Sequence, residues 1–535
     1  MHKTIAKIWL LLLVSWTGGC TQAQNLTTAG GRGTVETVRP ATSRLGINLG
    51  GIHDWMSELP FVNVFRSSRT WVSQKQGEKW GSGPALDLDE HGWVKRLEAG
   101  TFAETPFLNV PSHHYPHGNY IFLYDGEGRV EVQGAGKIVE SKPGRIVFEL
   151  GPSDKFKTVR IMSTNPANYI RNIRIVLPGT EATYQENPWN PVFVERWKNF
   201  NTIRFMDWMK TNNSYVKEWA DRPKMDDATW TVKGVPLEMM IALSNQLNMN
   251  PWFCMPHLAS DDYVRRFAAQ VKRDLKPGLK PYIEYSNEIW NSMFDQTKYS
   301  DEQGIALGFA DNAREAGFRF SAHRSVQIFK IWEEVYGGHE RFVRVIATQA
   351  ANTNVTQHKL TFQDAYKSCD ALATAPYFSW NIAPRNPNRP DDKLVAEEVV
   401  NWTPDQILDE VEKNRVPQSI EWMKKQKAFA DQYKLEHIAY EGGQHVVGLR
   451  DAMRNEKLTK LLQQVNRSER MGELYKRYLD AWRDQGNGLF AIFSSVSPWR
   501  FSGSWGLLEF NDDTTPKYDA VMEWNQNNRL PTAPK

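Results

Sequence analysis

Residues 281–291 have the sequence PYIEYSNEIWN. The run begins with mostly apolar and aromatic residues over the length of a buried strand, and it passes into the polar residues Ser286, Asn287 and Glu288. A second stretch, AYEGGQH at residues 439–445, also follows an apolar run with a carboxylate, Glu441. Buried strands that finish on polar side chains are typical of a parallel sheet whose strand ends carry a site. These two stretches therefore indicate both the fold and the place of the site.

Outward from these stretches, short apolar runs alternate with amphipathic helical patterns. One helix is expected at 262–275, where Tyr263, Phe267, Val271 and Leu275 recur at helical spacing. Other helices are expected within 312–336 and 403–433. Eight strands that alternate with helices predict an α/β fold, a (β/α)8 or TIM barrel. The expected barrel strands are 45–49, 202–206, 251–255, 281–285, 344–347, 371–375, 437–440 and 489–493.

The region 80–180 has a different pattern of short alternating strands, separated by turn signals at roughly ten-residue spacing. This pattern predicts an antiparallel β-sandwich, inserted after the first barrel strand. The expected division of the chain is a targeting signal at 1–23, a linker at 24–42, a barrel at 43–75 and 185–530, and the inserted module at 80–180.

The N-terminus has the form of an export signal. Lys3 and Lys7 precede an apolar run at 8–16, which is too short to remain as a membrane span. The following Thr17-Gly18-Gly19-Cys20 resembles a bacterial lipobox, with lipidation at Cys20. Cleavage after Ala23, which gives soluble export, is the alternative. We therefore expect an exported protein, either an outer-membrane or cell-surface lipoprotein or a periplasmic or secreted protein.

Composition narrows the classes of partner. The 535 residues carry a formal net charge of only +3, which gives no reason to expect nucleic acid or an anionic membrane as partner. The chain has 21 Trp residues, whose flat faces can stack on sugar rings or fill the core. Cys254 and Cys369 have no metal-ligand spacing and are expected in the core. We expect no cofactor and no metal, including at His113-His114 and His117.

Hydrolysis of a glycosidic bond requires two carboxyl groups. One protonates the leaving oxygen, and the other attacks the anomeric carbon or activates a water. Glu288 follows the fourth expected strand and Glu441 follows the seventh, so both belong to the mouth of the barrel and face each other across it. Glu284 lies inside its strand, where an ion pair with a neighbouring barrel residue is expected.

Tyr285-Ser286-Asn287-Glu288 and Tyr440-Glu441-Gly442-Gly443 resemble the clan A glycoside hydrolases, retaining (β/α)8 enzymes. The resemblance covers about residues 45–70 and 190–525 and is nearest to a divergent cellulase-like group, some of whose members are described as cellulose-binding. It implies a retaining enzyme that cleaves a β-linked polysaccharide or oligosaccharide. In that reading Glu288 is the acid/base and Glu441 the nucleophile.

The same resemblance assigns supporting roles. Asn287 would bind the sugar 2-hydroxyl, Arg204 would keep Glu441 ionised, and Tyr377 would hydrogen-bond Glu441. The implied substrate contacts also include a polar group at His257 and an aromatic platform at Trp499 or, as second choice, Trp505.

Charge and burial predict different proton affinities for the two acids. Arg204 should lower the pKa of Glu441 by ion pairing, whereas Ile289 and Trp290 should desolvate Glu288 and raise its pKa. A retaining pair would lie about 5–5.5 Å apart and an inverting pair about 6.5–9.5 Å apart. Two other classes stay open, a non-catalytic carbohydrate-binding protein on a barrel scaffold and a metal-dependent hydrolase.

Overall fold

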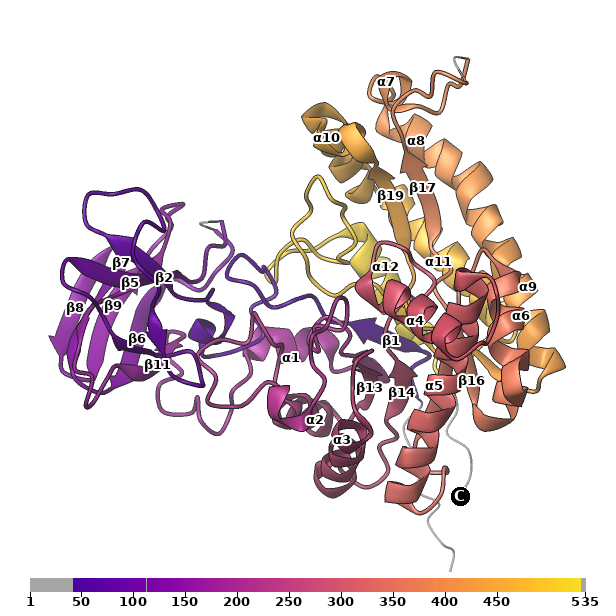
Figure 1. The fold of residues 1–535 in the computed structure, drawn as a ribbon. Coiled ribbons are helices and arrows are strands. Elements are labelled where there is room, and N and C mark those ends of the chain that lie inside the picture. Colours follow the sequence, from indigo (N-terminus) through magenta and orange to yellow (C-terminus); the bar gives the residue numbers. More distant parts are fainter. Residues whose placement is uncertain (1–41, 112, 390, 531–535) are drawn as a thin grey trace, which may run out of the picture. The chain divides into compact units, whose positions relative to one another are not determined.

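A computed structural model describes residues 42–530 except residues 112 and 390. Eight parallel strands close into a barrel in the order β1-β12-β13-β14-β15-β16-β18-β20, as predicted (Figure 1). Every strand lies within two residues of its predicted limits. The strands are β1 (Leu45–Asn48), β12 (Thr202–Arg204), β13 (Asn250–Met255), β14 (Tyr282–Tyr285), β15 (Val343–Ala347), β16 (Ala371–Thr374), β18 (Glu436–Ala439) and β20 (Phe490–Ile492).

Alternation along the strands divides the apolar residues into two layers. Trp252 and Cys254 of β13 belong to a small cluster together with Ala371 and Ala373 of β16, and this cluster fills the barrel. The intervening residues, such as Phe253, belong to a larger cluster between strands and helices. Small alanines opposite a tryptophan fit the limited width of the barrel. The interior therefore has room for polar side chains only towards the strand ends.

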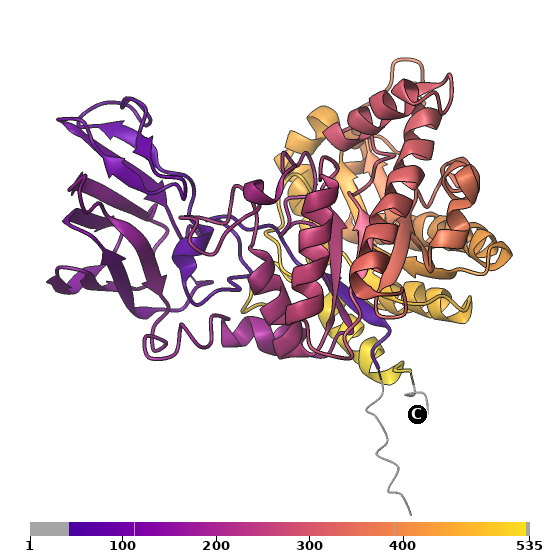
Figure 2. The same cartoon turned by 60° about the horizontal axis from the view of Figure 1, so that its bottom comes forward.

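The helices surround the barrel (Figure 2). Ser260 caps α3, where its hydroxyl accepts a hydrogen bond from the Tyr263 amide, and Phe267 and Val271 face the core as predicted. The helices are α1 (Pro191–Trp197), α2 (Leu237–Leu247), α3 (Asp261–Asp274), α4 (Asp295–Ala306), α5 (Ala313–Tyr336), α6 (Thr353–Thr361), α7 (Ala396–Val399), α8 (Pro404–Glu410), α9 (Val416–Gln432), α10 (Glu456–Asn466), α11 (Glu469–Asp484) and α12 (Pro516–Asn527). Shorter helical turns are Val64–Ser67, Trp219–Asp221, Phe362–Ser368, Val411–Arg415 and Arg450–Arg454.

Between β1 and β12 the chain forms two four-stranded antiparallel sheets, β2-β5-β10-β7 and β11-β6-β9-β8. They enclose a separate apolar core that includes Tyr120, Phe122 and Phe148. The strands are β2 (Val72–Lys75), β5 (Thr101–Pro106), β6 (Gly118–Asp125), β7 (Gly128–Gln133), β8 (Lys137–Lys142), β9 (Arg145–Leu150), β10 (Thr158–Thr164) and β11 (Arg171–Val176), and a hairpin adds β3 (Asp87–Leu88) and β4 (Val94–Arg96).

The sandwich begins earlier than the sequence indicates. β2 pairs with β5, with Val72 opposite Glu104, whereas the sequence pattern predicts that residues up to 75 belong to the barrel. The sequence Val-Ser-Gln-Lys has one apolar residue and no alternation, so only the backbone pairing reveals this strand. The limit of the barrel at residue 75 is therefore corrected to a point before Val72.

The histidine-containing loop of the sandwich contacts the C-terminal part of the barrel. His114 Nδ1 lies 2.9 Å from Asp512 Oδ1, and its ring stacks on Phe510 with centroids 3.6 Å apart. His114 therefore has a packing role.

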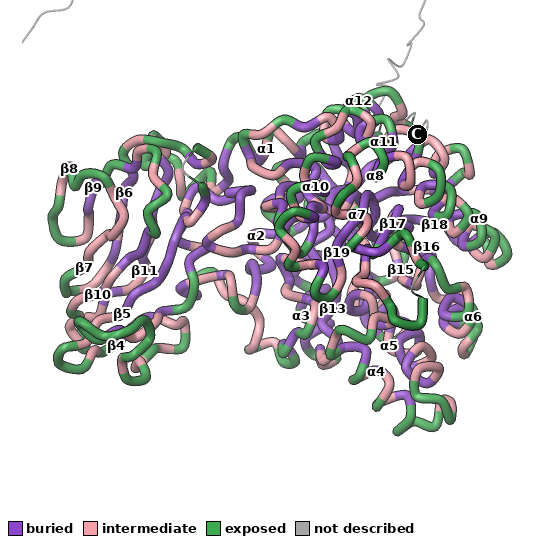
Figure 3. Tube along the Cα trace, turned by 90° about the horizontal axis from the view of Figure 1, so that it is seen from above, coloured by how far each residue is buried: buried purple, intermediate pink, exposed green. Residues whose placement is uncertain are grey.

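Burial follows the two cores, because the barrel strands are mainly buried and the exposed positions lie on outer helix turns and loops (Figure 3). No helix within residues 42–530, as far as they are described, combines the length and apolarity of a membrane span.

Candidate active site

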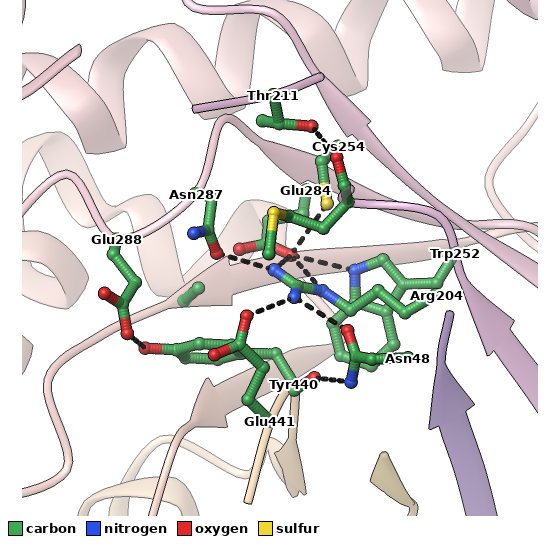
Figure 4. A network of polar contacts seen from close by, with 12 residues as sticks. Asn48, Arg204, Thr211, Trp252, Cys254, Glu284, Asn287, Glu288, Tyr440 and Glu441 are labelled. Atoms are coloured by element: carbon green, nitrogen blue, oxygen red, sulfur yellow. Dashed lines mark hydrogen bonds and ion pairs between the residues drawn. The ribbon is translucent and has the colours of Figure 1, made fainter. Parts of the chain in front are cut away.

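Arg204 is the centre of the polar network inside the barrel, and it is fully buried (Figure 4). Its Nη1 donates to Glu441 Oε1 at 2.8 Å and to Asn48 Oδ1 at 3.1 Å. Its Nη2 donates to Glu284 Oε2 at 2.8 Å and to Asn287 Oδ1 at 2.9 Å. One guanidinium therefore joins the ends of β1, β12, β14 and β18. The ion pair expected for Glu284 is present.

Glu441 has a donor on each carboxylate oxygen. Arg204 contacts Oε1, and the Tyr377 hydroxyl donates to Oε2 at 2.9 Å. Two further parallel strands, β17 (Phe378–Ile382) and β19 (Gln444–Gly448), pair beyond the barrel end. β17 begins directly after Tyr377, and β19 begins three residues after Glu441. The Phe378 amide also donates to the Gly443 carbonyl at 3.1 Å. The pairing of β17 with β19 therefore holds the phenol against the carboxylate.

The position directly after Glu441 leaves room only for glycine. A Cβ at Gly442 would lie 2.3 Å from Cζ of Phe490, a buried ring in the neighbouring β20. Real Cβ atoms do not approach this closely, so any larger residue would displace the strand end that carries the carboxylate.

Glu288 lies at the end of a strained turn. Both Ser286 and Glu288 have left-handed backbone angles, with φ of 58° and 43°, which is uncommon for residues other than glycine. The Glu288 carboxyl is held by Asn291 Nδ2 at 2.9 Å on Oε2 and by the Tyr440 hydroxyl at 3.4 Å on Oε1. Glu288 is partly exposed, whereas Glu441 is 5% exposed.

Asn287 is fixed from both sides of its amide. Its Oδ1 accepts from Arg204, and its Nδ2 donates to Asn212 Oδ1 at 3.1 Å. Gln296 of α4 completes the arrangement, since its Nε2 donates to both Asn212 Oδ1 and the Asn287 carbonyl. The amide next to Glu288 therefore has a single defined orientation relative to Arg204.

Burial and charge act in opposite directions on the two acids. Burial raises the pKa of Glu441 and Glu288 adds to the rise, whereas Arg204 and Tyr377 lower it. Burial also raises the pKa of Glu288, against the lowering effect of Asn291, Arg204 and Tyr440. Arg204 therefore lowers the pKa of Glu441 as predicted, but the net shift is upward because burial outweighs an arginine whose charge is shared with Glu284.

Two neighbouring acids of this kind titrate as a pair. When the pair holds one proton, Glu441 has the guanidinium and the phenol as donors to its charged form. Glu288 has no cation within its hydrogen-bonding contacts, which are Asn291 and Tyr440. The charge is therefore favoured on Glu441 and the proton on Glu288, the distribution that an acid and a nucleophile require.

Two residues predicted for substrate contact lie away from this network. Trp499 is 3% exposed and is packed between Arg467 and Lys517, with its indole N–H bonded to the Gly506 carbonyl. A ring covered by two cations offers no face to a sugar, so the first choice of platform is wrong. The second choice, Trp505, is partly exposed. Its ring centroid lies 6.3 Å from that of Phe493 and 5.8 Å from that of His445, and both of these rings also neighbour the Tyr377 ring.

His257 follows β13 as predicted, but its buried Nδ1 forms no hydrogen bond to this network. Its ring contacts Tyr299 of α4, with centroids 5.3 Å apart, and its carbonyl accepts from the Tyr285 hydroxyl. Tyr285 faces the helix layer, because the alternate residue Glu284 faces the barrel interior. His257 therefore belongs to the packing around α4, and burial lowers its pKa to about 4.

Five residues of the site were not singled out from the sequence as site residues. Asn48 positions Arg204, and both Tyr440 and Asn291 hold Glu288. Asn212 and Gln296 fix Asn287. Asn48 and Tyr440 could have been found, since each is a polar residue at the inward-facing end of a predicted strand. Asn291 follows Glu288 by three residues in a turn, and no periodic pattern marks it.

The network around Arg204 consists of carboxyl, amide and phenol side chains. Within the described part of residues 42–530, the group of three side chains that could hold a metal ion lies elsewhere, at His91, Asp226 and Asp227.

Comparison with known proteins gives structural likenesses only. No protein-family model matches the chain, and the search of curated proteins gives no match. A 4-O-α-L-rhamnosyl-β-D-glucuronidase from Fusarium oxysporum is similar at 10% identity and a TM-score of 0.38, over 65% of this chain and 66% of that one. The family 51 α-L-arabinofuranosidase AbfB from Bifidobacterium longum is similar at 9% identity and a TM-score of 0.40, over 64% of this chain and 68% of that one.

A third structure covers more of the chain. It consists of the CBM22-1 and GH10 modules of an endo-1,4-β-D-xylanase from Clostridium thermocellum, at 10% identity and a TM-score of 0.31, over 88% of this chain and 96% of that one. These similar structures are glycoside hydrolases, but likenesses of this size do not bear on the activity or substrate of this chain.

Proposed function

We propose that this chain is a retaining O-glycoside hydrolase of clan A type, acting on a β-linked polysaccharide or oligosaccharide. The observation that carries the proposal is one guanidinium that binds the first acid directly and also binds the residue next to the second. Arg204 binds the Glu441 carboxylate and, through its other terminal nitrogen, the Asn287 amide beside Glu288. The two acids follow the fourth and seventh strands of the barrel, β14 and β18, and both are at the end where barrel enzymes bind substrate.

In the first step, Glu441 attacks the anomeric carbon and forms a glycosyl–enzyme ester, while Glu288 gives its proton to the departing oxygen. The Glu441 oxygen pair is oriented for this role by Arg204 and Tyr377. Asn291 and Tyr440 hold the Glu288 carboxyl in place while it is protonated. The Asn287 amide, fixed by Arg204 and Asn212, is positioned to bind the sugar 2-hydroxyl.

In the second step, Glu288, now ionised, removes a proton from a water that attacks the anomeric carbon and releases Glu441. Two inversions at one carbon give net retention. Formation of the ester in the first step removes the negative charge of Glu441. Glu288 then no longer faces a charged carboxylate. Loss of that charge lowers the pKa of Glu288 and suits it to act as a base.

The test is product release from a panel of β-linked polysaccharides by the wild type and by Glu441→Gln. The matched control is Glu436→Gln, since Glu436 is at the exposed opposite end of the same strand, β18. We expect products from the wild type and the control, and a loss on the order of 10⁴–10⁶-fold in Glu441→Gln. Products first released in the β configuration, seen by proton NMR, would support retention. Equal release by all three proteins would contradict the proposal.

If Glu441→Gln binds a glycan as the wild type does but no longer hydrolyses it, the non-catalytic alternative is excluded. A wild type that binds a glycan of the panel and releases nothing would favour the carbohydrate-binding protein. Full activity after exhaustive chelation would exclude the metal-dependent hydrolase.

We also propose export of the chain, with lipidation at Cys20. That residue and the targeting segment lie outside the described residues. Cys20→Ser should abolish incorporation of labelled fatty acid, and unchanged labelling would contradict the proposal.

A further inference from the structure

A second cluster of ionisable side chains joins the sandwich module to a barrel loop. His91 lies in the turn between β3 and β4, and Asp226 and Asp227 lie in the segment between β12 and α2. The two segments are already hydrogen-bonded, since the Ala228 amide donates to the His91 carbonyl at 2.8 Å and the Trp93 indole donates to the Asp226 carbonyl at 3.2 Å. The cluster is therefore held in place by backbone contacts and does not depend on flexible side chains alone.

The spacing of the three ligand atoms matches that of a metal centre. His91 Nδ1 lies 3.3 Å from Asp226 Oδ1 and 3.6 Å from Asp227 Oδ1, and all three atoms lie within 4.8 Å of one another. Ligands at about 2.0–2.1 Å from a tetrahedral zinc ion are separated by roughly 3.3–3.4 Å. Two of the three spacings therefore need a movement of only a few tenths of an ångström or less.

Two of these atoms are buried and form no hydrogen bond. Asp227 is 4% exposed, and its Oδ2 accepts from the Lys224 amide at 2.8 Å, but its Oδ1 has no hydrogen-bond donor. The buried Nδ1 of His91 likewise forms no hydrogen bond. A buried carboxylate oxygen without a donor is costly, and each such atom in a native protein calls for an explanation. The two atoms lie 3.6 Å apart.

Carboxylates surround the His91 ring. Three of them, Glu90, Asp226 and Asp227, lie within 3.8 Å of its ring nitrogens. Three cations lie at the edge of the cluster: Lys233 Nζ is 3.9 Å from Asp227 Oδ2, Lys224 Nζ is 3.9 Å from Glu90 Oε2, and Arg66 Nη1 donates to the Asp227 carbonyl. None of them donates to His91 Nδ1 or Asp227 Oδ1. Glu90 faces Nε2, the nitrogen opposite the cluster, as the carboxylate partners of metal-binding histidines commonly do.

The geometry points to a divalent-cation site formed by His91 Nδ1, Asp226 and Asp227, with Zn²⁺ as the best-suited ion. One imidazole and two carboxylates form a mixed nitrogen and oxygen set, which suits zinc better than calcium or magnesium. Three protein ligands leave a fourth position for water. The ion would connect the β3–β4 hairpin to the loop after β12. That loop begins near Asn212, which holds Asn287.

The site can be tested by calorimetric titration of the chelator-treated full chain with zinc chloride alone. We expect one Zn²⁺ per chain, with weaker binding of Ca²⁺ and Mg²⁺, and a higher unfolding temperature with zinc. Asp226→Asn should weaken zinc binding at least tenfold. Asp226 is largely exposed, so this variant should fold, and His91→Gln should weaken binding further. The matched control is His114→Gln, which removes another histidine–aspartate contact of the same module.

Two results would overturn the site. One is a wild type whose dissociation constant for zinc is weaker than about 1 mM, which would leave His91 as a simple ion-pair partner of the two aspartates. The other is unchanged zinc binding in both Asp226→Asn and His91→Gln, which would place the ion elsewhere. Should His91→Gln fail to fold by circular dichroism, Asp226→Asn decides the question alone. Hydrolytic activity has no part in these measurements, so failure of the proposed enzyme function would leave the result readable.

Discussion

Both the barrel and the sandwich hold a buried glutamate against an arginine, yet the two pairs have different surroundings. In the sandwich, Glu104 accepts from Arg160 Nε at 2.8 Å and from the Thr158 hydroxyl on the same oxygen. In the barrel, Arg204 is fully buried and serves two carboxylates, Glu441 and Glu284. The sandwich pair has one acid and one base, whereas the barrel network has more acids than cations.

The difference shows which feature of a buried ion pair indicates chemistry. A neutralised pair such as Glu104 and Arg160 can satisfy its hydrogen bonds and remain unreactive. In the barrel, Glu288 adds a further carboxyl beside Glu441, and the two acids raise each other's proton affinity. Proton sharing between neighbouring acids, and not burial of a glutamate alone, separates the candidate active site from a structural contact.

The largest predicted effect is the loss of hydrolysis when the proton donor of the barrel site, Glu288, is replaced. Glu288→Gln removes the proton donor but keeps the side chain's shape, so hydrolysis of a polysaccharide should fall about 10²–10⁴-fold. An aryl glycoside with an acidic leaving group needs little protonation and should lose far less in its first step. Initial rates on both substrates check this. An equal loss on both would contradict the acid role of Glu288.

A smaller loss is expected when one hydrogen bond to the nucleophile is removed. Tyr377→Phe deletes the donor to Glu441 Oε2, and a hydrogen bond to a charged group contributes about 1.5–3 kcal/mol, or roughly ten- to a hundredfold in kcat/KM. The control in the other region is Tyr120→Phe, which deletes a buried phenol's bond to the Pro116 carbonyl in the sandwich. The control should keep full activity, and similar losses in both variants would indicate a general effect on folding.

The pH dependence sharpens the comparison through the coupling of the two acids. The wild type should show a bell-shaped rate profile, with a basic limb from loss of the Glu288 proton and an acidic limb from protonation of Glu441. The basic limb reports the coupling, since the negative charge of Glu441 raises the pKa of Glu288. In Glu288→Gln no proton remains to be lost from that side chain, so the basic limb should disappear. The acidic limb should stay near its wild-type position, because Glu288 is already protonated on that limb and Gln is likewise neutral. Rates on the aryl glycoside measure both limbs, and a basic limb that persists in Glu288→Gln would contradict the acid role of Glu288.

Sequence patterns predicted the parts of this molecule that depend on periodicity. The eight barrel strands and the strand-end positions of Glu288 and Glu441 follow from polar residues placed after apolar runs. The contacts of Glu441 with Arg204 and Tyr377 were implied only by the resemblance to clan A glycoside hydrolases. The β2 strand was missed because its identity depends on pairing with β5. Which of two nearby tryptophans is covered depends on the distant Arg467 and Lys517, so the choice of Trp499 was wrong. The pKa of Glu441 depends on burial and on how Arg204 is shared, and neither can be read from spacing.

A change in the sandwich pair should have the smallest effect on activity but a measurable effect on stability. Glu104→Gln removes the charge that accepts from Arg160 and Thr158 and should lower the free energy of unfolding by about 1–3 kcal/mol. The side chain of Arg160 is 32% exposed, so water can solvate it after the change and limits the loss. Urea unfolding measures the change.

Glu131→Gln is the matched control on the same sheet. Its partner Arg129 is 65% exposed, and surface pairs of this kind contribute about 0–1 kcal/mol. Hydrolysis should be unchanged in both variants, because neither glutamate neighbours a second acid that shares its proton. A loss of activity in Glu104→Gln without a loss of stability would mean that the sandwich face takes part in substrate handling, and the contrast between the two ion pairs would then fail.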